Sequence, residues 1–427
     1  MEITVKPAEK IEGRTRIPGD RDIAHRALVF SSLAENTIEI EGLTKTPDLL
    51  STLHCLKELG VEFAGDGDRL KVKGKGLRGF KEPDNVLNVG GSESTAFLLT
   101  GLLAGQPFHT TLTGDGSLRT RSMKKVTDPL KQMGAAISGR HNSELLPLSI
   151  RGYDLLPISY GMPEAGSQLK SALLTAALFS RGVSEITDLY NTRDHTERAL
   201  HYLGAEIQTG RSHIRLKNPA KLKGERFHIP GDISAALFLS VAATLAPHGE
   251  LYMEDVGINP SRTGMLDILG RMGARISILN EREFNCEPVA DLLVKSGRKL
   301  KGIEIKEEMM PQLMDDLPAL IVAALFAEGD TVIKTSALPA KELDCLKSLT
   351  LELRKMGALL KELPPDTLVI KGRAKLNSAC CESHTDHRIT MAVATAALFA
   401  ERESVIGGVE SVQSSFPGFF DIMNRLV

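Results

Sequence analysis

A tetrapeptide that occurs twice divides this 427-residue chain into two similar halves. Ile17-Pro18-Gly19-Asp20 recurs 212 positions later as Ile229-Pro230-Gly231-Asp232, and each copy precedes a run of small and apolar residues. Because proline fixes φ and glycine permits a positive φ, each copy predicts a rigid turn, and the run after it predicts a helix. The chain is therefore expected to be a duplication whose matched junctions are hinge points.

A finer repeat predicts six α/β units. Five helical stretches end in a glycine that is followed by alanine or valine, and successive glycines are 74, 70, 69 and 84 residues apart: Gly60, Gly134, Gly204, Gly273 and Gly357. Such glycines suit the left-handed position after a helix, and the alternating segments that follow them predict strands. A helix over residues 419–426 would close a sixth unit, which gives three units of roughly 70 residues in each half. Helix–glycine–strand junctions occur in any α/β protein, but the near-regular spacing favours a repeat.

Composition and charge argue against several classes of protein. The chain is 42% apolar, enough for two cores, and its net charge is only −2 with both signs interspersed, so neither nucleic acid nor a membrane surface is an expected partner. No apolar run reaches the ~18 residues of a spanning helix, and the N-terminus lacks the apolar core of a signal peptide, so a cytoplasmic location is expected. The five cysteines are scattered and odd in number, which predicts reduced thiols and no metal site.

The duplicated turn also predicts the domain boundaries. One domain should comprise residues 18–230 and the other residues 1–17 plus 231–427, with hinges near Pro18-Gly19 and Pro230-Gly231. Helices around residues 171–179 and 317–326 are apolar on all faces, which is typical of helices buried beneath sheets. Residues 280–297 form one of the longest irregular stretches and are interpreted as a surface loop or a ribbon between strands.

Polar clusters of the first half lie at the unit junctions. Arg21 and Arg26 follow the first glycine turn, where helix N–H groups and guanidinium groups together favour an anion, and residues 114–122 repeat this arrangement. Residues 166–171 supply hydroxyl, amide and ammonium donors that suit a phosphate or a sugar hydroxyl. The dense polar run at residues 192–198 also fits an N-cap with i,i+4 ion pairs. Each cluster, taken alone, equally fits a solvated or capped helix start.

The second half supplies carboxylates. Asp315 precedes a buried helix, Lys341 and Glu342 lie in a polar turn, and Asp386 and Arg388 precede a further helix. Carboxylates beside lysine and arginine can serve as acid and base with separated pKa values. Since one half offers cations and the other carboxylates, a small anionic ligand held between two closing domains is the favoured interpretation.

Taken in order along essentially the whole chain, these motifs resemble those of the 3-phosphoshikimate 1-carboxyvinyltransferase (EPSP synthase) family. The resemblance implies an α/β fold, a two-domain inside-out α/β barrel of the enolpyruvyl transferase type, with six βαβαββ units, three per domain. It also implies that no metal or organic cofactor is needed, and we expect a monomer. The motifs that carry it are Pro18-Gly19-Asp20 with His25-Arg26, Gly114-Asp115 with Ser117-Leu118 and Arg121, Ser167-Gln168 with Lys170-Ser171-Ala172, Arg193-Asp194-His195-Thr196-Glu197-Arg198, Pro230 to Ala236, Asn259 to Gly264, Asp315 before Leu317-Pro318, Lys341-Glu342, and Asp386-His387-Arg388 with Phe416-Pro417.

For activity, the resemblance implies transfer of the enolpyruvyl (1-carboxyvinyl) group of phosphoenolpyruvate to a hydroxyl of 3-phosphoshikimate, with release of phosphate, in the shikimate pathway of aromatic amino acid biosynthesis. It implies acid/base roles for Asp315 and Glu342, with Lys341 beside them and near the acceptor's phosphate. The implied acceptor contacts include Arg26 at the carboxylate, Ser167 and Thr192 near the phosphate, and Gln168 at the ring. The other implied acceptor contacts are Arg21, Asp22, Gly166 and Arg193. The implied phosphoenolpyruvate contacts are Arg21, Glu93, Arg121, Cys345 and Arg388.

Several of these positions depart from the family's pattern. Arg21 stands where the family has lysine, and Gly166 replaces the first serine of the Ser-x-Gln cradle. Two departures add carboxylates, and two others remove arginines. Because each lost arginine contact costs ~1.5–3 kcal/mol, the two losses predict that phosphoenolpyruvate binds more weakly by roughly two to four orders of magnitude. The remaining substitutions are Asp22 for a serine, Gly91, Glu93 and Phe97 in the Asn-x-Gly-Thr-x-x-Arg loop, Cys345 for an arginine and Ser414 for a lysine that many members carry.

Three functions stay open on the sequence alone. The first is the family activity with a rearranged phosphoenolpyruvate site. The second is that of a divergent paralogue acting on a different acceptor or donor, and the third is that of a non-catalytic ligand-binding homologue. Asp315 and Glu342 argue against the third, because a pure binding protein has little need for an acid/base pair.

Overall fold

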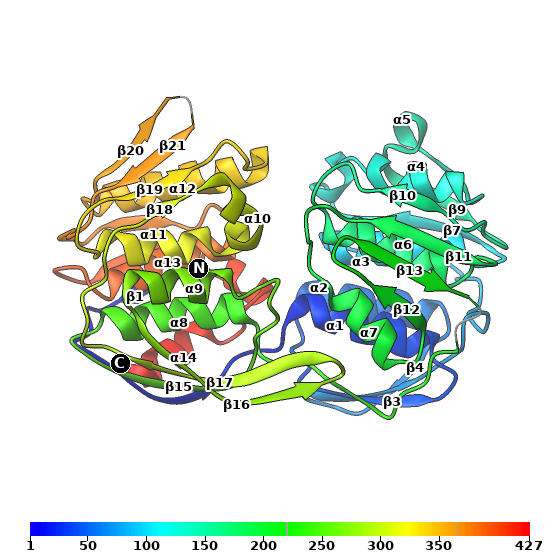
Figure 1. Ribbon diagram of the computed structural model, residues 1–427, viewed down its shortest axis with the longest axis horizontal. Coiled ribbons are helices and arrows are strands. Elements are labelled where there is room, and N and C mark those ends of the chain that lie inside the picture. The colour runs from blue at the N-terminus through cyan, green and yellow to red at the C-terminus, as the bar shows by residue number, and fades with distance from the viewer. Residues whose placement is uncertain (219–220, 365) are drawn as a thin grey trace. The chain divides into compact units, whose positions relative to one another are not determined.

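The structure, a computed structural model, describes residues 1–218, 221–364 and 366–427 (Figure 1). Contacts divide the chain into two compact units. Unit 1 contains Met1–Pro18, Pro230–Arg282 and Pro288–Val427, and unit 2 contains Gly19–Ile229 and Glu283–Glu287. This division differs from the sequence expectation at Pro18 and Pro230, which cluster with unit 1, and at residues 283–287, which cluster with unit 2. The assignment of hinges to Pro18-Gly19 and Pro230-Gly231 stays a prediction.

The described residues form six separate sheets, three in each unit. In each sheet of unit 2 the first strand is parallel to the second, which is antiparallel to the third, which is antiparallel to the fourth. A repeated strand order of this kind agrees with the six α/β units expected from the glycine spacing. The sheets of unit 2, in spatial order, are β14 (Arg226–His228), β3 (Thr37–Glu41), β5 (Arg69–Lys73), β4 (Glu62–Ala64); β6 (Leu87–Asn88), β7 (His109–Thr113), β9 (Leu145–Arg151), β8 (Ala136–Gly139); and β10 (Ser159–Gly161), β11 (Val183–Thr187), β13 (His213–Lys217), β12 (Glu206–Thr209).

In unit 1 the N-terminal strands complete two of the sheets. β2 (Lys10–Arg16) pairs in parallel with β15 (His248–Gly257), and β1 (Glu2–Val5) pairs antiparallel with β23 (Ser404–Gly407). The first and last parts of the chain are therefore held in the same unit by backbone hydrogen bonds. The other strands of this unit are β16 (Arg275–Phe284) and β17 (Glu287–Lys295), then β18 (Glu304–Ile305), β19 (Thr331–Lys334), β21 (Thr367–Ile370) and β20 (Leu360–Leu363), and finally β22 (Cys380–Glu382).

Each unit also contains helices that are buried along most of their length, as their small and apolar residues predict. In unit 2 these are α1 (Arg21–Leu33), α3 (Glu93–Ala104) and α6 (Ser167–Ala177), and in unit 1 they are α8 (Ile233–Leu245), α11 (Leu317–Leu325) and α13 (His387–Ala397). More exposed helices are α2 (Pro47–Glu58), α4 (Lys124–Gln132) and α7 (His195–Tyr202) in unit 2, and α9 (Gly264–Met272), α10 (Met310–Leu313), α12 (Ala340–Lys355) and α14 (Phe419–Leu426) in unit 1.

The glycines that ended the predicted helices all have a positive φ. The values lie between 86° and 105° for Gly60, Gly134, Gly204, Gly273 and Gly357. Because a side chain strains this left-handed backbone, glycine is the residue that lets each helix end and a strand begin there. The expected helix at residues 419–426 is confirmed as α14.

The irregular stretch expected at residues 280–297 is largely ordered. It is the greater part of a long hairpin, β16 and β17, whose turn contains Asn285 and Cys286 with φ values of 45° and 63°. Two successive positive φ values are typical of the tight turn that matches the twist of paired strands. In the turn segment, the Asn285 amide exchanges hydrogen bonds with the backbone of His228, both 2.7 Å long.

Candidate functional site

Both Pro-Gly-Asp copies lead directly into a buried helix, but neither forms the predicted turn, because Gly19 and Gly231 lie in β-bridges and neither has a positive φ. Asp20 and Asp232 are the N-caps of α1 and α8, with φ/ψ values of −59°/122° and −69°/119°. Each side chain accepts a hydrogen bond from a backbone N–H of the first turn, a contact typical of an N-cap aspartate. A Cβ on Gly19 would lie 2.1 Å from the carbonyl oxygen of Gly42, so only glycine permits this close approach.

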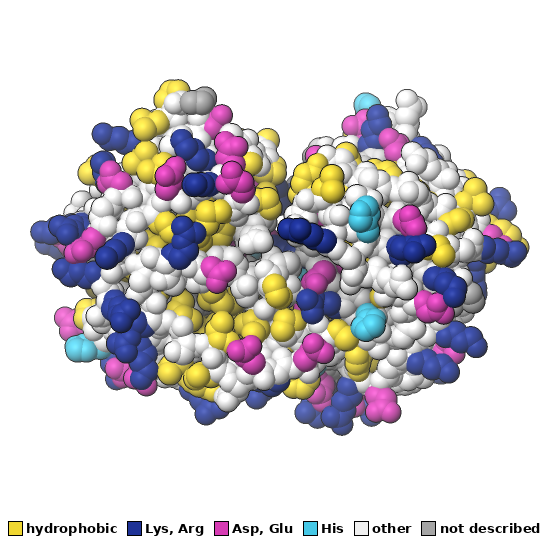
Figure 2. All heavy atoms as spheres, in the orientation of Figure 1, with side chains coloured by type: hydrophobic (Ala, Val, Ile, Leu, Met, Phe, Trp, Pro, Cys, Tyr) yellow, Lys and Arg dark blue, Asp and Glu magenta, His cyan; other side chains and the backbone are white. Residues whose placement is uncertain are grey.

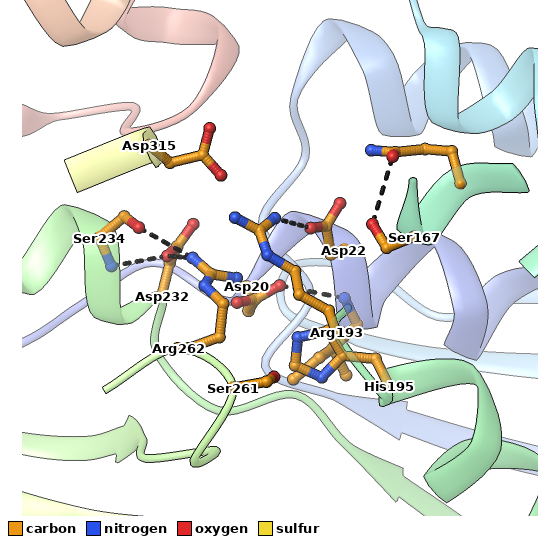
Figure 3. Close-up of polar contacts among 12 residues, drawn as sticks. Asp20, Asp22, Ser167, Arg193, His195, Asp232, Ser234, Ser261, Arg262 and Asp315 are labelled. Carbon is orange, nitrogen blue, oxygen red and sulfur yellow. Dashed lines mark hydrogen bonds and ion pairs between the residues drawn. The ribbon is translucent and has the colours of Figure 1, made fainter. Parts of the chain in front are cut away.

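The segment that starts α8 is held by a buried arginine. Arg262 donates from Nη2 to Asp232 Oδ1 at 3.0 Å and to Ser234 Oγ at 2.9 Å (Figure 3). Its side chain is almost fully buried, so the Asn-Pro-Ser-Arg motif that carries Arg262 supports the start of α8.

Arg26 lies in the second turn of α1 and is buried in unit 2. Its Nε donates to Thr196 Oγ1 at 2.8 Å, Nη1 to the carbonyl oxygen of Asp22 at 2.6 Å, and Nη2 to Ser171 Oγ at 2.7 Å. These three contacts fix the position of Arg26. A guanidinium has five N–H donors, so two of them take no part in these contacts. Arg26 therefore links α1 with α6 and α7, the helices that carry the other predicted acceptor residues.

Asp22 pairs with a predicted acceptor residue that is 171 positions away in the chain. Arg193 Nη1 donates to Asp22 Oδ2 at 2.5 Å, and both side chains are mostly buried. Figure 3 shows this pair near Ser167, whose hydroxyl donates to the Gln168 side-chain oxygen at 3.2 Å. The structure thus brings most of the predicted acceptor residues together in unit 2, at the starts of α1, α6 and α7. Arg21 lies 3.8 Å from a carboxylate oxygen of Asp48 in the same unit.

A buried ion cluster fixes the loop that carries Thr192. Lys170 Nζ lies 3.1 Å from Asp188 Oδ2 and 2.7 Å from Glu197 Oε1, and all three side chains are nearly inaccessible to solvent. Lys170 also donates to the carbonyl oxygen of Thr192 at 3.0 Å, and Thr192 donates from Oγ1 to Asp188 at 2.6 Å. The Lys170 ammonium, which the sequence offered as a ligand donor, is therefore engaged by carboxylates of its own unit.

Burial and ion pairing have opposite effects on the pKa values of the carboxylates in this cluster. Burial raises the pKa of Glu197 above its ordinary value, although Lys170 opposes the effect. For Asp188, burial also acts to raise the pKa, but hydrogen bonds from Thr192 and Lys170 outweigh it and the pKa is lowered. The sequence did not indicate a role for Asp188, because this residue lies four positions before Thr192, outside the polar run at residues 192–198, and belongs to no recognisable motif.

Glu93 faces one of the predicted phosphoenolpyruvate residues. Arg121 Nη1 donates to Glu93 Oε2 at 3.0 Å, and both side chains are about two-fifths exposed. Glu93 is the first residue of α3, directly after the N-cap Ser92. Phe97, on the next turn of α3, is 5% exposed and belongs to the hydrophobic core of unit 2. The segment from Gly91 to Phe97 thus supplies a carboxylate to Arg121 and no cation.

In unit 1, Arg388 gathers three of the predicted carboxylates. It donates from Nη1 to Glu342 Oε2 at 2.7 Å and from Nη2 to Asp386 Oδ2 at 2.8 Å, and Nη1 lies 3.7 Å from Asp315 Oδ1. Burial alone would lower the pKa of Arg388, but the hydrogen bonds from this guanidinium to Asp386 raise it. The pKa of Asp386 is well below its usual range, since those hydrogen bonds outweigh burial. Asp386 and Arg388 are therefore both charged near neutral pH.

The predicted residues at the start of α12 have different surroundings. Lys341 is exposed, Glu342 is half-buried beside Arg388, and Cys345 is buried. Burial raises the pKa of Cys345 to about 12, so this thiol is neutral and supplies no substitute for an arginine charge. In unit 1, Asp315 is the more exposed of the two proposed acid/base groups, with 42% of its side chain accessible and 11% for Glu342.

The described residues contain no group of three or more His, Cys, Asp or Glu side chains arranged to hold a metal ion. On the face drawn in Figure 2, basic and acidic side chains are interspersed, without an extended field of one sign. Within the described part of the chain, no helix has both the length and the apolar character needed to cross a membrane.

The architecture is that of the enolpyruvyl transferase class of α/β proteins. An EPSP synthase from Acinetobacter baumannii superposes with a TM-score of 0.93 at 36% identity, covering 100% of this chain and 98% of that one. The enolpyruvyl transferase NikO from Streptomyces tendae has a TM-score of 0.78 at 15% identity, covering 99% and 96% of the two chains, which is a likeness of fold alone. The predicted fold class is confirmed.

Sequence comparison identifies the family. Residues 5–423 match the family described as EPSP synthase (3-phosphoshikimate 1-carboxyvinyltransferase). A 3-phosphoshikimate 1-carboxyvinyltransferase from Pelotomaculum thermopropionicum is 44% identical over 100% of this chain and 99% of that protein. The protein of the same description from Brevibacillus brevis is 43% identical over 99% of each chain. This chain belongs to the EPSP synthase family of enolpyruvyl transferases, as its motifs predicted.

Proposed function

We propose that this chain transfers the enolpyruvyl group of phosphoenolpyruvate to a hydroxyl of 3-phosphoshikimate and releases phosphate. The proposal rests on family membership and on one observation above all, the cluster of Glu342, Asp386 and Asp315 around Arg388 in unit 1. The relatives carry this activity in their names, and none of the names favours the paralogue or the non-catalytic alternative.

The chemistry requires two opposite proton transfers. As the acceptor oxygen bonds to C2 of phosphoenolpyruvate, its proton must leave and C3 must gain one. The tetrahedral intermediate then loses a proton from C3, the bond from C2 to the phosphate oxygen breaks, and the double bond is restored. Asp315 and Glu342 are the proposed carriers of these protons, because carboxylates held at short range in a partly buried site can act as acid and base in turn.

Arg388 is proposed to bind the anionic donor. Its charge is fixed by Asp386 and Glu342, and an arginine fork suits a carboxylate or a phosphate. In unit 2, the group formed by Arg21, Arg26, Ser167, Gln168, Thr192 and Arg193 is proposed to hold the acceptor, with Asp22 orienting Arg193. Arg121 is the proposed donor contact of unit 2, with Glu93 as its present partner.

A coupled phosphate-release assay tests this function. With phosphoenolpyruvate and 3-phosphoshikimate both present, we expect phosphate to be released at a steady rate, and we expect no release when either compound is omitted. Absence of phosphate release from folded protein at saturating concentrations of both would contradict the proposal. The cytoplasmic location and the monomeric state stay predictions.

A further inference from the structure

A buried carboxylate on α12 lies away from the proposed proton carriers and contacts the loop that leads into Asp386 and Arg388. Glu352 is near the end of α12, and its side chain is completely buried. Buried carboxylates are rare unless they are paired, so the contacts of this one indicate what it does.

Glu352 accepts three hydrogen bonds, one of them from the last residue of β22 and one from the segment that follows this strand. Its Oε1 lies 2.7 Å from His384 Nε2, and its Oε2 accepts from the backbone N–H of Glu382 at 3.0 Å and from Lys355 Nζ at 2.7 Å. Burial alone would raise the pKa of Glu352, but these contacts outweigh it and lower the pKa below its ordinary value. Glu352 is therefore an ionised acceptor at neutral pH, so His384 Nε2 carries the shared hydrogen.

The segment that Glu352 contacts has an uncommon backbone. His384 and Thr385 both have a positive φ, 50° and 60°, a region that a β-branched residue such as threonine rarely adopts. Such a conformation persists only where surrounding contacts determine it. The next residue is Asp386, whose side chain caps α13 and binds Arg388.

The same helix contacts this segment at two places. Glu342, in the first turn of α12, binds Arg388, and Glu352 is ten residues further along, about 15 Å at the rise of an α-helix. Because α12 contacts the residues on both sides of this strained loop, it fixes the distances from Glu342 to Asp386 and Arg388.

We propose that Glu352 is a positioning residue, which holds the loop His384–Thr385 and thereby keeps Asp386 and Arg388 in register with Glu342. It touches none of the proposed reacting atoms, and it acts through the loop. The inference about catalysis rests on the proposed function, whereas the inference about the loop does not.

Glu352→Gln tests the loop directly. An amide has one acceptor oxygen where the carboxylate has two, so at least one of the three donors would face an N–H₂ group. We expect the backbone N–H groups of Glu382, Asp386 and Arg388 to exchange with deuterium at least tenfold faster in the folded variant. A matched control is Asp291→Asn, which removes another mostly buried, multiply hydrogen-bonded carboxylate of unit 1, and it should leave exchange in this loop unchanged. Unchanged loop exchange in folded Glu352→Gln, or the same increase in the control, would overturn the proposal.

A double-mutant cycle tests the link to catalysis. We expect Glu352→Gln to lower kcat about tenfold with little change in KM, and to have no further effect in a Glu342→Gln background, because the group whose register it maintains is then absent. An equal decrease in both backgrounds would mean a general loss of structure and would overturn the catalytic part. If the wild type released no phosphate, the proposed function would fail, while hydrogen exchange would still decide whether Glu352 holds the loop.

Discussion

Three arginines that the family resemblance assigns to anionic substrates are paired with carboxylates of their own unit. Arg121 binds Glu93 and Arg193 binds Asp22 in unit 2, while Arg388 binds Asp386 and Glu342 in unit 1. A substrate anion must therefore share or displace a carboxylate at each position. Since exposed ion pairs contribute little stability and buried ones are costly to break, the Glu93 pair should open most readily.

At this scale the first prediction concerns the proposed acid/base pair. Asp315→Asn and Glu342→Gln each keep the shape and remove the capacity to transfer a proton, so we expect kcat to fall by ~10²-fold or more in each. Steady-state phosphate release measures kcat, and circular dichroism checks that the variants fold. Near-wild-type turnover in both variants would exclude these roles.

A second residue-scale prediction concerns Glu93. Glu93→Gln removes the charge that competes for Arg121 and repels an incoming anion, so phosphoenolpyruvate should bind about tenfold more tightly, a difference of ~1.4 kcal/mol. Calorimetric titration of the variant and the wild type measures it. This single change is preferable to restoring an arginine at position 97, because Phe97 is buried in the core of unit 2.

The control for Glu93 removes the same charge elsewhere on unit 2. Glu185→Gln breaks an exposed cross-strand pair with Arg215 and should leave phosphoenolpyruvate affinity unchanged. If Glu93→Gln bound no more tightly than wild type, Glu93 would not compete for the donor site. If both variants gained equally, the effect would be one of net charge alone.

Sequence alone predicted which residue types would gather, but it could not predict how they pair. Asp22 and Arg193 are 171 positions apart, and nothing near either residue indicates the other. Lys170 could be recognised as a donor, yet its two buried carboxylate partners depend on the packing of α6 and α7. The opposite case is Asp194 and Arg198, whose i,i+4 spacing predicted the ion pair that the structure contains at 2.8 Å.

At the scale of elements, two buried helices of unit 2 approach closely at a glycine. A Cβ on Gly101 of α3 would lie 2.3 Å from the carbonyl oxygen of Ala172 in α6. Ser167 and Gln168 begin α6, and Glu93 begins α3, so this contact fixes two predicted site segments relative to each other.

This contact yields a third prediction. Gly101→Ala should force the two helices apart and destabilise the protein by about 1–3 kcal/mol, a cost typical of overpacking. The helical Gly270 of α9 has no atom within 4 Å of an added Cβ, so Gly270→Ala should instead stabilise by ~0.4–1 kcal/mol. Urea unfolding of both variants measures the two changes. A Gly101→Ala protein as stable as wild type would mean that α3 and α6 are not tightly packed.

The elements were predictable where a local signal marks them. The five helix-ending glycines have the positive φ that their position predicts, and each Pro-Gly-Asp motif is followed by the predicted helix. The predicted turns are not found, because Gly19 and Gly231 lie in β-bridges and have no positive φ. The β16–β17 hairpin was not recognised, because its turn residue Cys286 is not one that usually adopts a positive φ, and polar residues hide the alternation. The pairing of β1 with β23 could not be predicted either, since it joins opposite ends of the chain.

At the scale of the whole molecule, the six sheets follow from the repeat that the sequence contains. The sheet of β22, β23 and β1 departs from the pattern because its third strand comes from the N-terminus. The N-terminal strand β1 therefore completes a sheet of unit 1, and a deletion of β1 would expose the edge of β23. The two short linkers at the Pro-Gly-Asp motifs remain the proposed hinges.

The identity of the reaction product tests the central claim, group transfer, most directly. After incubation with phosphoenolpyruvate and 3-phosphoshikimate, proton NMR and mass spectrometry should detect the acceptor carrying a 1-carboxyvinyl ether, in an amount equal to the phosphate released. Phosphate and pyruvate together with unmodified acceptor would mean that the chain hydrolyses phosphoenolpyruvate and does not transfer its enolpyruvyl group, which would contradict the account.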